Sequence, residues 1–317
     1  MRVSFVIPLY NCLPLTQAML ASLQASLPAG LEHEIIFVDD GSTDGTRDWL
    51  ATLPPPCVVR LNERNLGYAG ANNRGAAAAR GEYLALLNND LLLAPGWLAP
   101  ILAVHQRLGP RAGFVGNIQF NARTGAVDHA GIFINHRGKP EHLTALPPAR
   151  RWRALDAWRA ADAVTGACTV VRRDVFDRLG GFDEGFANGG EDVDFCLRSQ
   201  AAGHVSAVAL RSDVRHHVSA SPGRKLRDEQ NSRRLTLRWR DELARLAARS
   251  SWSEHYLQSQ WTSPHDPADN SLARQALAFV LGLRRDPPAA AYAGMQAAIA
   301  LELDRWNRLL GPVPGNP

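Results

Sequence analysis

Short apolar runs and helical patterns alternate along the first ninety residues. The apolar runs end in polar or turn residues, as buried parallel strands do: VSFVIP (3–8), EIIFVDD (34–40), CVVRLN (57–62) and EYLALLNND (82–90). Between them, Leu15, Met19 and Leu23 recur at helical spacing, and residues 43–53 and 68–80 form two more helical segments. This order predicts an α/β fold with a parallel sheet covered by helices.

Polar and turn residues gather where each predicted strand ends. In such open sheets, ligands bind beyond the carboxyl ends of the strands, so these residues predict a binding site. The residues, in chain order, are Pro8, Tyr10 and Asn11, then Asp39 and Asp40, then Asn65 and Gly67, and finally Asn89 and Asp90.

The predicted site lacks the glycine motifs of common nucleotide-binding folds. The turn after the first strand reads PLYNCLP, without the glycines of a dinucleotide fingerprint, and the Gly138-Lys139 pair is followed by proline instead of continuing as a phosphate loop. Carboxylates therefore define the site. They suit hydrogen bonding to a base or ribose, or a divalent cation shared with phosphate oxygens.

Composition narrows the class of protein. The chain has 317 residues, 45% hydrophobic and 21% charged, which is enough for one large α/β domain with an appendage or for two domains. Four widely spaced cysteines form no CxxC pair, which fits a reducing cytoplasm. No apolar stretch reaches the roughly 18 residues of a membrane span. The net charge of +4 lies mainly in residues 224–249, with nine basic and four acidic side chains.

Seven sequence motifs follow one another between residue 2 and about residue 222. They are VSFVIPLYN, FVDDGSTDGT, NLGYAGANNRG, LLNNDLLLAPGWL, TGACTVVRRDVF, GGFDEGF and GGEDVDFCLR. As a set they resemble the family 2 glycosyltransferases of the GT-A fold, especially bacterial enzymes of surface polysaccharide assembly. The resemblance implies a Rossmann-like, mostly parallel central sheet flanked by helices. We expect a GT-A domain at 1–222, with a nucleotide-binding half at 1–115 and an acceptor and catalytic half at 116–222, and a helical C-terminal extension at 223–317.

The resemblance also implies a nucleotide pocket and a metal site. Asp40 would bond the base, and Asp90 would be the metal carboxylate in a signature that here reads Asn88, Asn89, Asp90. A histidine of the irregular segment RHHVSAS, His216 rather than His217, would complete the site for Mg²⁺ or Mn²⁺. The other residues implied for the nucleotide pocket are Pro8, Tyr10, Asn65, Gly67 and Asn89.

The family's base corresponds to Asp192 of GGEDVDFCLR. Helical spacing begins beside this residue, so it lies in a first turn, where the helix dipole favours the ionised carboxylate. From local sequence alone, three carboxylates at a helix start are more typical of residues that complement the helix dipole. We expect Glu191 and Gly190 near the acceptor and Asp194 to be structural. Asp183 and Glu184 of GGFDEGF are competing candidates for the base, in a loop without helical support.

These features predict an inverting transferase that uses a UDP- or dTDP-sugar and acts on a saccharide or lipid-linked saccharide, with no nucleic acid partner. The alternatives are a noncatalytic sugar-nucleotide-binding subunit and a nucleotidyltransferase. HAGIFINHRGKPEH (129–142) is expected to form an acceptor-side loop with a short strand. Leu235, Trp239, Leu243 and Leu246 form an apolar helical stripe, which favours packing against the catalytic domain and leaves open peripheral contact with the cytoplasmic membrane.

Overall fold

The structure is a computed structural model that describes residues 1–145, 158–217, 227–262 and 270–312. The chain divides into two compact units, each described by itself below. The N-terminal unit contains Met1–Ile132 and His142–Arg227, and the C-terminal unit contains Phe133–Glu141 and Asp228–Pro317. The expected boundary between residues 222 and 223 lies outside the described residues, so it stays a prediction.

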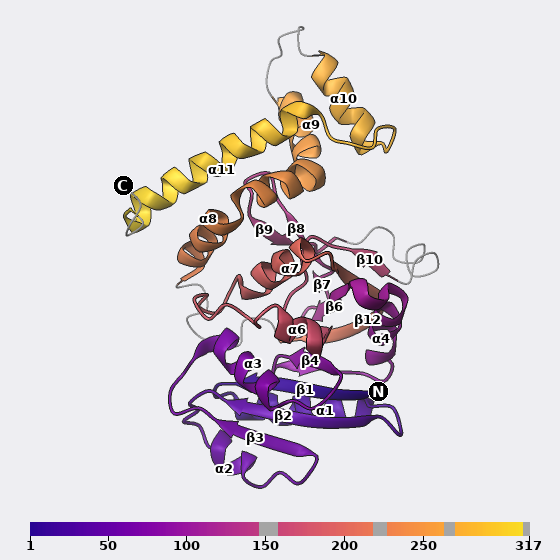
Figure 1. Cartoon of the computed structure of the whole chain (residues 1–317), viewed down its shortest axis with the longest axis vertical. Coiled ribbons are helices and arrows are strands. Elements are labelled where there is room, and N and C mark those ends of the chain that lie inside the picture. Colours follow the sequence, from indigo (N-terminus) through magenta and orange to yellow (C-terminus); the bar gives the residue numbers. More distant parts are fainter. Residues whose placement is uncertain (146–157, 218–226, 263–269, 313–317) are drawn as a thin grey trace. The chain divides into compact units, whose positions relative to one another are not determined.

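The N-terminal unit is built on one ten-stranded sheet (Figure 1). Along its main path the strands follow the order β10-β12-β6-β11-β4-β1-β2-β3, with β5 added to β12 and β7 to β6. The strands are β1 (Arg2–Leu9), β2 (Glu32–Asp39), β3 (Cys57–Leu61), β4 (Tyr83–Leu87), β5 (Leu91–Leu92), β6 (Ala112–Asn121), β7 (Val127–His129), β10 (Trp158–Ala160), β11 (Cys168–Arg172) and β12 (Val205–His216).

Most long pairings in this sheet are parallel, which confirms the predicted fold class. β1 pairs in parallel with both β2 and β4, β2 with β3, and β6 with β12, whereas β11 runs antiparallel between β4 and β6. The helices of this unit are α1 (Leu13–Ser26), α2 (Thr46–Leu50), α3 (Gly67–Ala78), α4 (Leu98–Leu108), α6 (Arg173–Arg178) and α7 (Glu191–Ala201).

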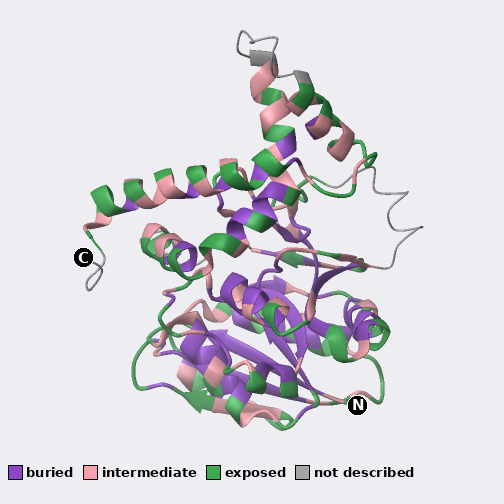
Figure 2. Cartoon of the chain, turned by 45° about the horizontal axis from the view of Figure 1, so that its top comes forward, coloured by how far each residue is buried: buried purple, intermediate pink, exposed green. Residues whose placement is uncertain are grey.

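Both faces of the central strands are buried, as the continuous apolar runs predict. Phe5 and Ile7 of β1 share a core cluster with Met19 and Leu23 of α1. Side chains alternate along a strand, so Val6 points to the opposite face, where α3 lies. A Cβ at Gly75 of α3 would come within 2.3 Å of Val6, so only glycine permits this close helix–sheet contact. Figure 2 shows these strands as buried.

Two expectations about local structure need correction. The helix predicted at 43–53 spans only Thr46–Leu50, because Gly45 before it is left-handed and the chain leaves helical geometry before the prolines at 54–56. Pro8 lies inside β1, not after it. The ladder between β1 and β4 ends at Val6, so a proline at position 8 removes no hydrogen bond from that ladder.

The C-terminal unit is mostly helical. A hairpin over residues 133–141 belongs to it, formed by parts of β8 (Ile132–Ile134) and β9 (Pro140–His142). Its helices are α8 (Asp228–Ala247), α9 (Ser253–Thr262), α10 (Asn270–Val280) and α11 (Ala289–Leu310), with a π-helical turn at Ala248–Trp252. None of the helices in the described ranges is long and apolar enough to span a lipid bilayer.

The predicted apolar stripe of α8 is largely buried. Leu235, Leu243 and Leu246 are at most 7% exposed, and α8 packs against α11 within the same unit. Trp239 is the exception, because it has non-helical backbone angles at a kink in α8. Because these leucines are buried, they do not form an exposed apolar surface.

Candidate active site

Asp40 is held at the carboxyl end of β2 by three hydrogen bonds to its carboxylate. The side-chain amide of Asn62 and the backbone N–H of Leu66 both donate to Oδ1, at 2.7 and 2.8 Å, and the N–H of Gly67 donates to Oδ2 at 2.8 Å. Asp40 is only 4% exposed. A carboxylate offers about four acceptor positions, so one position on Oδ2 remains for a ligand.

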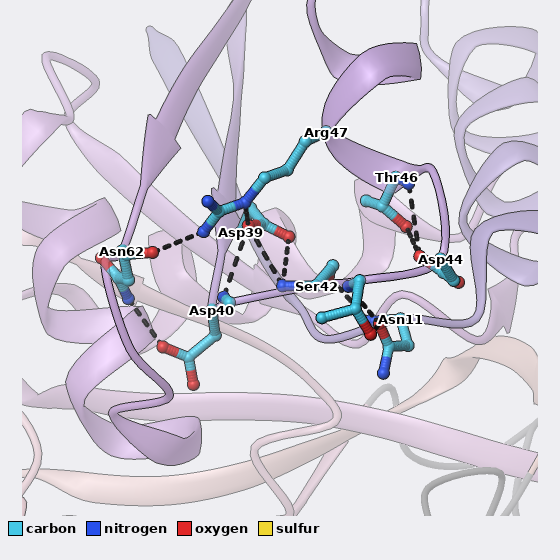
Figure 3. Close-up of polar contacts among 10 residues, drawn as sticks. Asn11, Asp39, Asp40, Ser42, Asp44, Thr46, Arg47 and Asn62 are labelled. Carbon is cyan, nitrogen blue, oxygen red and sulfur yellow. Dashed lines mark hydrogen bonds and ion pairs between the residues drawn. The ribbon is translucent and has the colours of Figure 1, made fainter.

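The carboxylate of the neighbouring Asp39 is bound by donors of the protein itself (Figure 3). Its carboxylate accepts from the backbone N–H groups of Gly41 and Ser42 and forms an ion pair with Arg47 at 2.7 Å. Because Arg47 also donates to the backbone oxygen of Asn62, it fastens the ends of β2 and β3 together. The two adjacent aspartates therefore have different contacts: Asp39 is fully buried and paired with Arg47, whereas Asp40 binds the segment at 66–67.

Two residues expected in the nucleotide pocket, Tyr10 and Asn65, follow the strands β1 and β3 that flank β2. Tyr10 follows β1 and is 48% exposed. Asn11 has a left-handed backbone, and its side-chain oxygen accepts from the N–H of Thr43, which holds the turn after β2 (Figure 3). Asn65 is exposed and shares the N–H of Gly67 with Asp40. These hydrogen bonds connect the loops that follow β1, β2 and β3.

Asp90 and His216 lie next to each other. Nε2 of His216 is 3.1 Å from Oδ1 of Asp90, and Nδ1 is 3.8 Å from Oδ2 of Asp128. Burial alone would lower the pKa of His216, but hydrogen bonding and charge from Asp128 and Asp90 outweigh it and raise the pKa to about 9. His216 is therefore a buried cation at neutral pH, between two carboxylates.

The expectation that His216 lies in an irregular segment is wrong. It is the last residue of β12, where it pairs with Leu91 of β5. β5 follows Asp90 directly, so this short pairing is what brings the histidine and the carboxylate together. The second histidine, His217, donates its backbone N–H to the carbonyl of Asp90. Residues 218–221 of RHHVSAS lie outside the described part of the chain.

The asparagines before Asp90 make contacts within the fold. The side-chain amide of Asn89 donates to the hydroxyl of Thr16 in α1, at 2.9 Å. The backbone N–H of Asn88 donates to the carbonyl of Ala167, at 2.8 Å. Asn89 therefore contacts α1 in this structure, although the sequence predicts contact with the nucleotide.

Asp192 occupies the first turn of α7 and is half-buried. Oδ2 accepts from the backbone N–H of Gly166 at 3.0 Å, and Oδ1 accepts from the N–H of Val193 at 2.8 Å. Gly190 is the N-cap residue, with φ of 94°. Glu191 is 5% exposed and accepts from the N–H of Gly189. The helix start therefore holds both carboxylates through backbone donors.

Asp194 has the structural role expected for it. It is fully buried and forms an ion pair with Arg198 at 2.8 Å, one turn along α7. The buried aromatic residues of α7 and its surroundings fix the helix further, because Phe195 stacks on Phe114 of β6 at 4.2 Å. The competing carboxylate Glu184 accepts from the side chain of Asn73, outside any helix.

A turn at residues 165–167 joins three of the motifs. It receives a hydrogen bond from Asn88 at Ala167 and donates one from Gly166 to Asp192. The hydroxyl of Tyr68 donates to the carbonyl of Gly166 at 2.7 Å, and the N–H of Tyr68 donates to the side chain of Asn188. Burial, then the charges of Glu191 and Asp192, raise the pKa of Tyr68 well above its usual value. Tyr68, Asn88 and Asp192, from three different motifs, therefore all bond to one turn.

Sequence reasoning missed four residues of this region. Tyr68 and Gly166 stand inside recognised motifs, so their positions in NLGYAG and TGAC were the available signal. Asp128 precedes the loop assigned to the acceptor and His129 begins it, and nothing in their spacing marks them. His129 is fully buried, and burial, followed by the charges of His142, Arg159 and His216, lowers its pKa well below the usual value.

Comparison with known proteins agrees with this geometry. The family model for glycosyl transferase family 2 matches residues 4–180. The O-antigen biosynthesis protein RfbC of Myxococcus xanthus is 33% identical over 227 residues, or 69% of this chain and 18% of that protein. An N-acetylglucosaminyl-diphospho-decaprenol L-rhamnosyltransferase of Mycobacterium tuberculosis is 29% identical over 241 residues, or 68% of this chain and 76% of that protein.

A solved structure has the same fold. GalNAc-T7 with UDP, GalNAc and Mn²⁺ superposes with a TM-score of 0.63 at 19% identity, covering 96% of this chain and 57% of that one. The chain spans 26% and 18% of the lengths of two curated relatives that it matches. The family match extends over more than half of the chain, and its motifs end the strands of a GT-A sheet, so the chain belongs to glycosyl transferase family 2.

Proposed function

We propose that this chain is an inverting glycosyltransferase of surface polysaccharide assembly. It moves a sugar from a UDP- or dTDP-linked donor to a hydroxyl of a glycan or lipid-linked saccharide. The observation that carries the proposal is the turn at residues 165–167, which hydrogen-bonds both the segment before Asp90 and the carboxylate of Asp192. Donor and acceptor chemistry need to meet within bonding distance, and one shared turn supports that arrangement.

Asp192 is the base in this proposal. Its carboxylate takes the proton of the acceptor hydroxyl as that oxygen bonds to the anomeric carbon, while the bond from this carbon to the nucleoside diphosphate breaks. Half-burial at a helix start supports the role, because the side chain is held by backbone donors and still accessible to an acceptor. Glu191 and Gly190 border the same helix start and would contact the acceptor.

Asp40 would hold the donor nucleotide. Its remaining acceptor position on Oδ2 suits an N–H of a pyrimidine base, and the segment Asn65–Gly67, which it already binds, would cover that base. Tyr10 and Pro8 would form the opposite side of the pocket. A thymine or uracil base presents the same N–H, so both UDP and dTDP donors fit this chemistry.

Asp90 and His216 would hold a divalent cation, Mg²⁺ or Mn²⁺. The fit is reasonable because Asp90 Oδ1 and His216 Nδ1 are buried and make no well-aligned hydrogen bond with the described residues. No group of three ligand side chains occurs in the described ranges, so phosphate oxygens and water would supply the other ligands. When bound, the cation would balance the charge of the leaving diphosphate. His216 must lose its proton to become a ligand.

A noncatalytic sugar-nucleotide-binding subunit is the second candidate. The observation that favours it is the amide at Asn88, the first position of the metal-binding signature, which adds no negative charge to the metal site. The two candidates share the donor pocket and differ in the role of Asp192. A variant of that residue therefore separates them.

The test replaces Asp192 with Asn in the full chain. We expect transfer to fall by about 10²–10⁴-fold, while the donor still raises the melting temperature in the presence of Mn²⁺. Both carboxylate oxygens accept from backbone N–H groups, so the new amide would face one donor and cost about 1–3 kcal/mol of stability. The melting temperature of the variant without donor measures this loss of stability separately.

The matched control is Asp183→Asn, in the loop that offers the competing carboxylate. We expect this variant to retain transfer. Donor identity comes from a panel of nucleotide sugars scored by the shift in melting temperature with and without Mn²⁺. Unchanged turnover in Asp192→Asn would remove the base assignment, and the absence of a shift with every donor would remove the proposal as a whole.

A further inference from the structure

A cavity of about 590 Å³ lies within the C-terminal unit. One wall is a face of α11, and the other comes from the hairpin at 133–141 and from residues 252–255. This volume falls in the range of small-molecule sites, about 300–1,000 Å³. None of the carboxylates described above lines it, so its chemistry is separate from that of the transfer site.

The α11 wall changes from apolar to charged along the helix. Met295 is fully buried at its base, and Leu301 is 70% exposed at its rim, followed by Glu302, Arg305 and Arg308. α11 comes close to Trp252 at Gly294, where a Cβ would lie 2.6 Å from the indole nitrogen. The cavity therefore has an apolar floor and a basic end.

The opposite wall carries flat rings. His136 of the hairpin and His255 of α9 stack face to face, with ring centroids 3.7 Å apart and planes 7° apart. Burial, then the charges of His255 and Arg137, lower the pKa of His136, so that ring is uncharged at neutral pH. A neutral imidazole offers both a donor and an acceptor, and its flat face suits the C–H side of a sugar ring.

The cavity is lined by more arginine than carboxylate side chains. Arg305 forms ion pairs with Glu229 and Glu302, and Lys139 forms another with Glu302. Arg137 and Arg308 are exposed, and within the described ranges neither guanidinium has a hydrogen bond or an ion pair. Glu141 acts on His136 through its charge but makes no ion pair with Arg137 among these residues. Two arginines thus remain available to an anion.

We propose that this cavity binds an anionic saccharide, with a sugar ring against the stacked histidines and a phosphate or carboxylate group on Arg137 and Arg308. Guanidinium groups bind both anions through paired N–H donors, and Arg is the residue best suited to that geometry. The inference goes beyond the transfer reaction and holds whichever residue acts as its base. It gives the C-terminal unit a binding task of its own, for a negatively charged segment of a glycan.

The experiment titrates the full-length protein by calorimetry with four probes: glucose 1-phosphate, glucuronic acid, inorganic phosphate and glucose. We expect the two anionic sugars to bind more tightly than either phosphate or glucose alone, because ring and anion contacts act together. The comparison of glucose 1-phosphate with glucuronic acid decides which anion the cavity prefers. Equal binding of inorganic phosphate and glucose 1-phosphate, or of glucose and the anionic sugars, would overturn the proposal.

Variants locate the binding in the cavity. The double variant Arg137→Ala/Arg308→Ala should bind the preferred anionic sugar at least about tenfold more weakly, with an unchanged melting temperature, since both side chains are exposed. Arg240→Ala, an exposed arginine of α8 that does not line the cavity, is the control and should bind normally. Asp192→Asn should also bind normally, so failure here is distinguishable from failure of the proposed transfer. Wild-type affinity in the double variant would place the binding elsewhere.

Discussion

The N-terminal and C-terminal units hold their charged side chains differently. At the carboxyl edge of the N-terminal sheet, Asp40 and Asp192 are held mainly by backbone N–H groups of neighbouring loops. Backbone donors do not rotate away, so these carboxylates have fixed positions before any ligand binds. In the C-terminal unit, the cavity instead presents long arginine side chains, two of which make no bond with the described residues.

The difference indicates two kinds of recognition. A carboxylate fixed by the backbone suits a reacting or base-reading group, whose geometry decides the rate. Exposed guanidinium groups suit a ligand whose position varies, because each side chain adjusts at a cost in rotamer entropy. We therefore expect substitutions on the N-terminal side to have large, specific effects and those on the C-terminal side to have small, electrostatic ones.

The largest effect on donor binding is expected for Asp40→Ala. The variant leaves the N–H groups of Leu66 and Gly67 and the amide of Asn62 without their acceptor, which costs about 2–4 kcal/mol of stability. It should also reduce donor affinity at least about 100-fold, since the base loses its partner and the covering segment its anchor. Donor-induced change in melting temperature measures the affinity.

Asp44→Ala is the matched control for that prediction. Asp44 accepts from Leu13 and from Thr46 at the start of α2, so its loss should cost about 1 kcal/mol, as for a helix cap. Donor binding should not change. If Asp40→Ala still shows the full donor shift, the nucleotide does not contact this carboxylate.

A smaller and more selective effect is expected for Tyr68→Phe. The variant removes the hydroxyl that holds the carbonyl of Gly166, while the ring and the backbone bond to Asn188 remain. Because Gly166 in turn holds Asp192, we expect kcat to fall about tenfold with little change in KM for the donor. Steady-state kinetics with varied donor and acceptor measures the two constants separately.

The control for this variant is Tyr83→Phe in β4. Its hydroxyl makes no hydrogen bond to any residue in the described ranges, although its ring packs on His105. We expect normal kinetics from it. If the donor KM of Tyr68→Phe changes as much as its kcat, Tyr68 supports the fold without positioning Asp192. The same conclusion follows if Tyr83→Phe loses as much activity as Tyr68→Phe.

The polar residues at the strand ends were predictable from the sequence because they directly follow apolar strands. The apolar runs at 34–40 and 82–90 end at Asp40 and Asp90, and parallel strands bring their carboxyl ends to one edge. The position of His216 was harder to predict. It depends on the pairing of β12 with the two-residue strand β5, and a strand of that length has no periodicity to detect.

Long-range contacts explain the remaining misses. Asp128 reaches His216 across 88 positions of sequence, and the hairpin at 133–141 groups with helices that begin at Asp228. The histidine pair of the cavity joins that hairpin to α9. Such pairings are set by tertiary packing, so no local pattern marks His136 and His255 as neighbours. The seven sequence motifs could be recognised because each lies within a few consecutive residues.

The smallest effect concerns the charged network of the C-terminal unit. The ion pair with Arg305, which outweighs burial, and the bond from Trp306 lower the pKa of Glu229. A lowered pKa stabilises the fold above the unfolded value of about 4.5, and the stabilisation is lost as pH falls through the folded value. Glu229 is 43% exposed, so solvent screening limits its contribution to less than about 1 kcal/mol. Melting temperature between pH 6 and pH 3 should therefore fall less steeply in Arg305→Ala than in the wild type. The same slope in both would show that this network, unlike the backbone-held carboxylates of the N-terminal unit, contributes nothing measurable to the fold.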